Sequence, residues 1–134
     1  MYRVNQKKLK AVAQKYKLDL IVAFGSQVKG RAVAGHSDLD VAGRFERGAR
    51  RDYQREVYLV SELAEALTSQ SELDFAILNG AGPLFIFEIA RTGVVLYQKT
   101  PTTFAQFRLY ASRIYEDHQK FFAARERYMK ARYG

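Results

Sequence analysis

The chain has no cysteine and no tryptophan, only two prolines, and 14 acidic residues against 22 lysines and arginines. Without cysteine there is neither a disulfide framework nor a zinc site built on thiolates, and a reducing compartment fits that composition. The sequence also lacks the ~18 uninterrupted apolar residues of a membrane span, and its first residues lack the apolar stretch of a signal peptide. We therefore expect a cytoplasmic protein without a membrane anchor.

Hydrophobic residues make up 48% of the 134 residues and aromatic residues 13%, which excludes a disordered chain. This length predicts one domain, 1–134, with a core of its own. The net charge is +8, and much of it lies near the two ends of the chain. Such a charge favours acidic or polyanionic partners, although basic side chains on solvated helix faces would give the same composition.

Hydrophobic periodicity predicts helices alternating with strands. The predicted helices cover 5–17, about 27–33, 50–68, 83–93 and 102–129, and the predicted strands cover 18–24, 38–45, 72–78 and 94–98. Within 50–68 the stripe expected to be buried is Tyr53, Val57, Val60, Ala64 and Leu67. This order indicates an α/β fold in which residues 1–100 form the sheet and its helices and residues 101–134 form a C-terminal helical arm.

The most informative segment is FGSQVKGRAVAGHSDLDVA, from Phe24 to Ala42. On a strand, Asp38 and Asp40 project from one face while Leu39 points into the core. Two carboxylates this close repel each other unless a cation lies between them, and magnesium is commonly held by one or two carboxylates together with substrate phosphates. The Gly25-Ser26 turn, at the start of a predicted helix, offers backbone N–H groups and a hydroxyl to those phosphates. The segment therefore predicts a magnesium-dependent nucleotide site.

A P-loop is excluded, although the spacing of Gly25 and Gly30 matches one. That motif continues with lysine and then serine or threonine, whose hydroxyl binds magnesium. Arg31 and Ala32 stand at those positions.

The segment instead resembles the signature of the nucleotidyltransferase superfamily that includes DNA polymerase β, in its minimal (MNT) branch. That signature reads approximately G-S-x-x-x-G, a spacer, then S-D-x-D and apolar residues. The matching residues here are Gly25, Ser26, Gly30, Ser37, Asp38 and Asp40. The spacer between Ser26 and Asp38 is one residue longer than the signature leads us to expect, and the extra residue falls within 34–36.

The resemblance implies a small mixed β-sheet flanked by helices, with a long C-terminal helix. It also implies a third carboxylate on a neighbouring strand, at Asp74. In this scheme Asp38, Asp40 and Asp74 are the catalytic, metal-binding residues for Mg²⁺. The triphosphate of ATP is bound by Gly25, Ser26, Lys29, Gly30 and Ser37. His36 and His118 receive no catalytic role.

The resemblance implies a protein acceptor as well. Minimal nucleotidyltransferases often accompany a HEPN-domain ribonuclease toxin, and as antitoxins they transfer AMP from ATP to a tyrosine of that toxin. The C-terminal helix is the candidate docking face, since apolar residues on more than one of its sides call for more than one neighbour. Its main stripe is Phe107, Ala111, Ile114, His118, Phe121 and Tyr128.

Two alternatives remain open from the sequence. One is a small-molecule nucleotidyltransferase with an aminoglycoside-like acceptor, which calls for an acidic acceptor pocket. The other is a non-catalytic module that masks a toxin or binds RNA, which would gain nothing from three mutually repelling carboxylates. Nucleic acid is a weak expectation because the basic ends lack a recognisable aromatic platform for single strands.

Overall fold

A computed structural model describes residues 2–25, 39–69 and 72–134. Its centre is a four-stranded sheet whose strands lie in the order β5-β3-β2-β6. The strands are β2 (Leu18–Phe24), β3 (Leu39–Phe45), β5 (Leu73–Ile77) and β6 (Val94–Gln98). β3 and β6 are antiparallel to β2, whereas β5 is parallel to β3. The predicted small mixed sheet is therefore confirmed, and each strand begins and ends within one residue of its predicted bounds.

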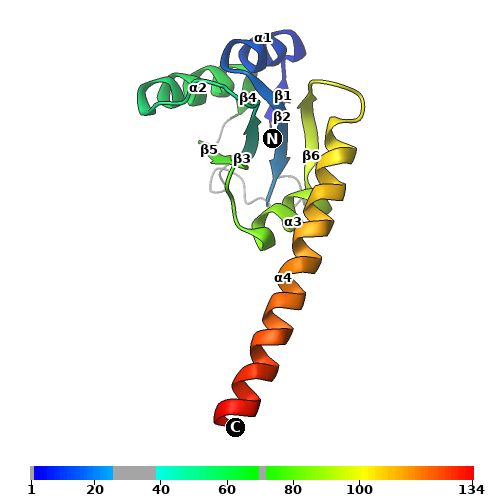
Figure 1. Ribbon diagram of the computed structural model, residues 1–134. Helices are drawn as coiled ribbons and strands as arrows, with labels where there is room; N and C mark the ends of the chain where they lie inside the picture. The colour runs from blue at the N-terminus through cyan, green and yellow to red at the C-terminus, as the bar shows by residue number, and fades with distance from the viewer. Residues whose placement is uncertain (1, 26–38, 70–71) are drawn as a thin grey trace.

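Helices cover both faces of this sheet (Figure 1). The helices α1 (Gln6–Tyr16) and α2 (Tyr53–Ala66) pack on one face, and α3 (Pro83–Thr92) and the start of α4 (Thr103–Tyr133) pack on the other. The strands supply both cores because successive side chains alternate between the two faces. In β2, for example, Ile21 and Ala23 join the core under α1 and α2, while Leu20 and Val22 join the core under α3 and α4.

Residues at both ends of α3 explain where it begins and how its last turn meets β2. Pro83 stands at the first helical position, where the missing N–H costs nothing. Gly93 ends the helix, and a Cβ there would lie 2.3 Å from Cγ1 of Val22. Only glycine allows so close an approach, so the turn from α3 into β6 brings the helix directly onto the central strand.

A second, two-stranded sheet was not predicted. It pairs β1 (Tyr2–Val4) antiparallel with β4 (Leu67–Ser69). Each strand has three residues, too few to show a period of two. The predicted helix 50–68 was wrong at its end because α2 stops at Ala66 and the chain continues directly into β4.

The predicted buried stripe of α2 was wrong in part: Leu67 is buried, but it lies in β4 rather than in the helix. Its buried residues are Leu59, Leu63 and Ala66, whereas Tyr53 is 85% exposed and Val57 is 49% exposed. The helix carries apolar residues on two adjacent faces, and helical periodicity does not determine which of them meets the sheet. Which face is buried depends on how the helix packs against α1 and the sheet.

The α4 helix continues four residues beyond its predicted end at Met129, because no glycine or proline lies between Met129 and Gly134 to stop it. Only its first part packs on the domain: Thr103, Phe107 and Ala111 are its buried residues. From residue 119 onward every residue is exposed. Across the described ranges, no helix is both long enough and apolar enough to span a membrane.

Candidate functional site

The candidate site lies at the edge of the sheet where β2 ends and where β3 and β5 begin. Phe24, the last residue of β2, pairs with Asp40 near the start of β3. Asp40 in turn pairs with Asp74 near the start of β5. The parallel pairing of β3 with β5 therefore places the two carboxylate residues at directly adjacent positions, on strands that lie about 4.8 Å apart.

Asp40 and Asp74 also point to the same face of the sheet. Their strand neighbours Leu39, Val41 and Leu73 pack into the core under α1 and α2. The period of two then places both carboxylates on the opposite face, which α3 and α4 share. Asp40 is half-buried and Asp74 is exposed, so the pair lies at a rim that a ligand can reach.

Gly25 brings the backbone of the β2 turn against this pair. Its φ is +84°, a conformation that side chains rarely adopt. A Cβ at this position would lie 2.3 Å from Oδ2 of Asp40. Both observations require glycine here, and together they show that the turn and the carboxylate are in direct contact.

An aromatic pair supports the turn from behind. The rings of Phe24 and Phe85 meet edge-to-face with centroids 5.5 Å apart. Phe85 belongs to α3, so this contact holds the end of β2 against that helix and sets the position of Gly25. The sequence did not single out either phenylalanine, because their pairing depends on how α3 packs; the only signal was an aromatic residue directly before the Gly-Ser pair.

Several sequence predictions lie outside the described residues: Ser26, Lys29, Gly30, Ser37, Asp38, the short helix 27–33 and the longer spacer at 34–36. Of the predicted site, Gly25, Asp40 and Asp74 are described, and the structure brings these three together. Within the part of the chain that is described, no group of three or more histidine, aspartate or glutamate side chains could hold a metal ion.

The residues at this edge fit a divalent cation. Carboxylates at adjacent positions of neighbouring strands repel each other, and a cation between them removes that cost. The oxygen donors of Asp40 and Asp74 are the ligands that magnesium and manganese prefer. The backbone of Gly25 lies directly beside Oδ2 of Asp40, so a phosphate bound by the turn would lie close to the same ion.

The free part of α4 extends past this edge of the sheet. Figure 1 shows α4 running beside β6, past α3 and beyond the end of β2. At the point of departure, the ring of Tyr115 stacks on Phe87 of α3 with centroids 3.9 Å apart. The helix α3 thus contacts the candidate site through Phe85, and through Phe87 it contacts the last part of α4 that packs on the domain. We call residues 116–133 the free arm.

Comparison with known families agrees with this geometry. The sequence model of the family described as polymerase beta, nucleotidyltransferase matches residues 7–102, which include all four strands of the central sheet. The chain belongs to this nucleotidyltransferase family. The resemblance identified from the sequence and the fold expected from it are both confirmed.

Solved structures similar to this nucleotidyltransferase include several toxin–antitoxin complexes. One, a crystal structure of a toxin–antitoxin with AMP-PNP, is matched with a TM-score of 0.70 at 24% identity, over 90% of this chain and 94% of the other. A mutant of the toxin–antitoxin MntA-HpeT is matched with a TM-score of 0.68 at 26% identity, over 91% and 94%.

A third similar structure holds a tri-AMPylated HEPN toxin of Shewanella oneidensis in complex with an MNT antitoxin. It is matched with a TM-score of 0.63 at 24% identity, over 90% of this chain and 91% of the other. A comparison with curated protein sequences finds no relative. At these identities the structural likeness establishes the fold, and the family match establishes the membership.

Proposed function

We propose that this nucleotidyltransferase is a magnesium-dependent enzyme that transfers AMP from ATP to a tyrosine of a HEPN-domain toxin, and that it acts as the antitoxin of the pair. The observation that carries the proposal is the adjacency of Asp40 and Asp74 beside the Gly25 turn. A structural role alone does not account for two like charges at neighbouring positions, whereas phosphoryl chemistry with a metal needs them.

The chain's own residues divide the work by position. Asp40 and Asp74, with Asp38 proposed from the sequence, would hold the magnesium, which when bound neutralises the triphosphate and polarises the α-phosphorus. Asp74 is the exposed member of the pair and lies where an incoming hydroxyl can reach it. We assign to it the removal of the proton from that hydroxyl.

The nucleotide side of the site is proposed to be the Gly25-Ser26 turn with Gly30, Lys29 and Ser37. Backbone N–H groups after a strand bind phosphates well, and a lysine adds a positive charge. The tyrosine oxygen then attacks the α-phosphorus, the bond to the β-phosphate oxygen breaks, and pyrophosphate leaves with the released electron pair. The product is a tyrosine carrying AMP through a phosphodiester.

The free arm supports a protein acceptor. The face of α4 that packs on α3 at Ala111 and Tyr115 continues along the arm as His118 and Phe122, at intervals of three or four residues, and then, seven residues later, as Met129. Phe122 is 46% exposed and Met129 43%, so a face built for helix packing has no neighbour among the described residues. Because α4 extends beyond the end of β2, a partner seated on this face would lie on the side of the domain where the Gly25 turn follows β2.

The structural neighbours point in the same direction. One of them contains an AMP-PNP nucleotide, and another contains a HEPN toxin that carries AMP. This chain covers 94% and 91% of these two matched chains, so the likeness extends over nearly their whole length. Both partners are proposed to meet in the cytoplasm.

The decisive experiment uses ATP labelled at the α-phosphate. It is incubated with Mg²⁺, the purified chain and the HEPN-domain protein encoded beside it. Covalent label on a tyrosine of the partner is expected with the native chain. It is also expected with the control variant Glu72→Gln, which removes the charge of an exposed carboxylate two positions before Asp74. No label is expected with Asp74→Asn. Label on neither protein while the two still co-purify would contradict the transferase proposal and leave a masking module.

The docking face is tested separately by binding. Phe122→Glu places a charge in the apolar face of the arm and should abolish co-purification with the partner. Ala124→Glu introduces the same charge at an exposed position on the opposite side of the helix and should leave the complex intact. Equal binding by both variants would exclude this face as the contact.

A further inference from the structure

A second site candidate lies at the opposite end of the sheet from Asp40 and Asp74. It is a groove of about 820 Å³ between α1 and β6, which we call the α1–β6 groove; its walls include Lys10 and Gln14 from α1, Lys17 directly after that helix, and Val95, Tyr97 and Lys99 from the β6 side. Leu18, the first residue of β2, also lines it. Since Gly25 follows the last residue of β2, about 20 Å of strand separates the groove from the candidate active site.

The groove reaches the open edge of the sheet. Among the described strands β6 pairs with β2 alone, so its other edge has no strand beside it. Leu96 and Tyr97 pack into the core under α1, whereas Val95 packs into the core on the opposite face, and all three line the groove. A groove that contacts residues from both faces of one strand must run along the strand's backbone. Such an edge is a template for pairing with another extended chain.

The charge of the groove is strongly one-sided. Lys10, Lys17 and Lys99 line it against a single carboxylate, Glu46, which is hydrogen-bonded to Lys99. The wall helix α1 contains four lysines and no acidic residue. A second copy of this chain is a poor occupant because each copy carries a net charge of +8.

We propose that the α1–β6 groove binds an extended acidic segment of a partner protein, which adds a strand to the open edge of β6 and places carboxylates opposite Lys10 and Lys17. Backbone pairing would supply affinity and the lysines would select acidic side chains. RNA fits less well because the groove presents lysines rather than arginines, and because its single aromatic residue, Tyr97, is partly buried against the core and forms no platform for successive bases.

The test is fluorescence anisotropy with a labelled synthetic peptide of about ten residues in which glutamate alternates with valine or threonine, titrated with the full chain. Saturable binding is expected. Methylation of alternate backbone nitrogens keeps the peptide's charge but blocks strand pairing, and it should weaken binding at least ~10-fold.

Variants of the chain locate the binding. Lys10→Glu combined with Lys17→Glu should weaken binding of the peptide at least ~10-fold. If the double variant does not fold, Lys10→Glu alone takes its place and should still weaken binding measurably. The matched control is Lys7→Glu combined with Lys8→Glu, which makes the same change in net charge at exposed α1 positions outside the groove. Circular dichroism melting checks that each variant is folded.

Three results would overturn the proposal. They are equal affinity for the methylated and unmethylated peptides, equal affinity of the Lys10/Lys17 variant and the Lys7/Lys8 control, and no saturable binding of the peptide. Tighter binding of a single-stranded oligouridine, lost on charge reversal at Lys10, would assign the groove to RNA instead. Label transfer from ATP is expected to be unchanged in all three variants, so this test is independent of the proposed catalytic function.

Discussion

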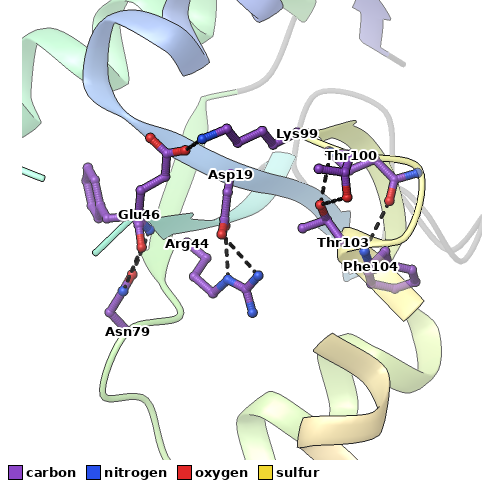
Figure 2. A network of polar contacts seen from close by, with 10 residues as sticks. Asp19, Arg44, Glu46, Asn79, Lys99, Thr100, Thr103 and Phe104 are labelled. Atoms are coloured by element: carbon purple, nitrogen blue, oxygen red, sulfur yellow. Dashed lines mark hydrogen bonds and ion pairs between the residues drawn. The ribbon is translucent and has the colours of Figure 1, made fainter. Parts of the chain in front are cut away.

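At one end of the central sheet the charged side chains are matched with partners, whereas at the other end two carboxylates occupy adjacent positions. Figure 2 shows the matched end, where Asp19 binds Arg44, Glu46 binds Lys99, and the side chain of Asn79 bonds to the backbone of Phe45 in both directions. At the other end, which is the proposed catalytic end, Asp40 and Asp74 are register partners on β3 and β5. The same two strands, β2 and β3, contribute to both ends.

The matched end is built for stability. Nε of Arg44 lies 2.9 Å from Oδ1 of Asp19 and Nη2 lies 3.1 Å from Oδ2, a bidentate pair in which both side chains are largely buried. The guanidinium also lies 5.7 Å from the centre of the Phe107 ring. This pair joins β2 and β3 to the first turns of α4. At the other end, the proposed function assigns the like charges of Asp40 and Asp74 to a ligand.

The largest effect in this comparison should come from Asp40→Asn. We expect transfer of AMP to fall more than ~100-fold, because even outer-shell partners of a metal site are typically worth 10- to 100-fold. The measurement is the initial rate of label transfer per folded molecule. Asp19→Asn neutralises a carboxylate at the matched end and should retain most of the specific activity; equal losses in the two variants would contradict the division between the ends.

The same Asp19→Asn variant should show the largest loss of stability, about 2 kcal/mol, because it leaves the largely buried Arg44 without its charged partner. Urea denaturation followed by circular dichroism gives the free energy of unfolding. Asp40→Asn should lose none of it in the absence of metal. A smaller loss in Asp19→Asn than in Asp40→Asn would reverse the roles of the two ends.

Gly25→Ala should have an intermediate effect, because it acts on both stability and activity. The left-handed backbone at φ +84° costs an alanine about 1 kcal/mol. In addition, the new Cβ would displace the Asp40 carboxylate, whose Oδ2 lies 2.3 Å from the Cβ position. We therefore expect transfer to fall by a larger factor than stability alone explains. The affinity for nucleotide, measured by calorimetry, should fall in parallel; normal affinity and rate would show that the contact with Asp40 is unimportant.

The smallest effect should come from Lys99→Gln at the matched end. The hydrogen bond that Lys99 donates to the Glu46 carboxylate raises the pKa of Lys99 above its ordinary value in the folded chain. A raised folded pKa stabilises the chain at pH values below the pKa of the unfolded lysine, and that stabilisation is lost as pH rises through the folded pKa. The variant should therefore be slightly less stable than the native chain at neutral pH and equally stable in strong alkali. A difference that stays constant with pH would point to packing instead.

Much of the fold could be predicted from the sequence because local patterns were strong. The buried run of β2 and the Pro83 and Gly93 signals at the ends of α3 each determine an element by themselves. The face of α2 could not be predicted because the helix has two apolar faces, and β1 and β4 could not because three residues carry no period.

The candidate site was predictable in part for a similar reason. The Gly-Ser turn and the Asp-x-Asp pattern are local, and they led to Gly25 and Asp40. That Asp74 lies at the same register as Asp40 depends on the parallel pairing of β3 with β5 across more than thirty residues of chain, which only the family resemblance indicated. The support that Phe85 gives to Phe24 depends on tertiary packing, and the aromatic residue directly before Gly25 was its only sequence signal.

The central claim, that Asp40 and Asp74 are placed together to share a divalent cation, is tested most directly by thermal unfolding of the native chain and Asp40→Asn under two conditions. In EDTA the variant should melt at or above the temperature of the native chain, because a repelling pair is relieved. With Mg²⁺ and α,β-methylene ATP the native chain should gain stability and the variant should not, so the order reverses. An equal gain in both chains would contradict the claim.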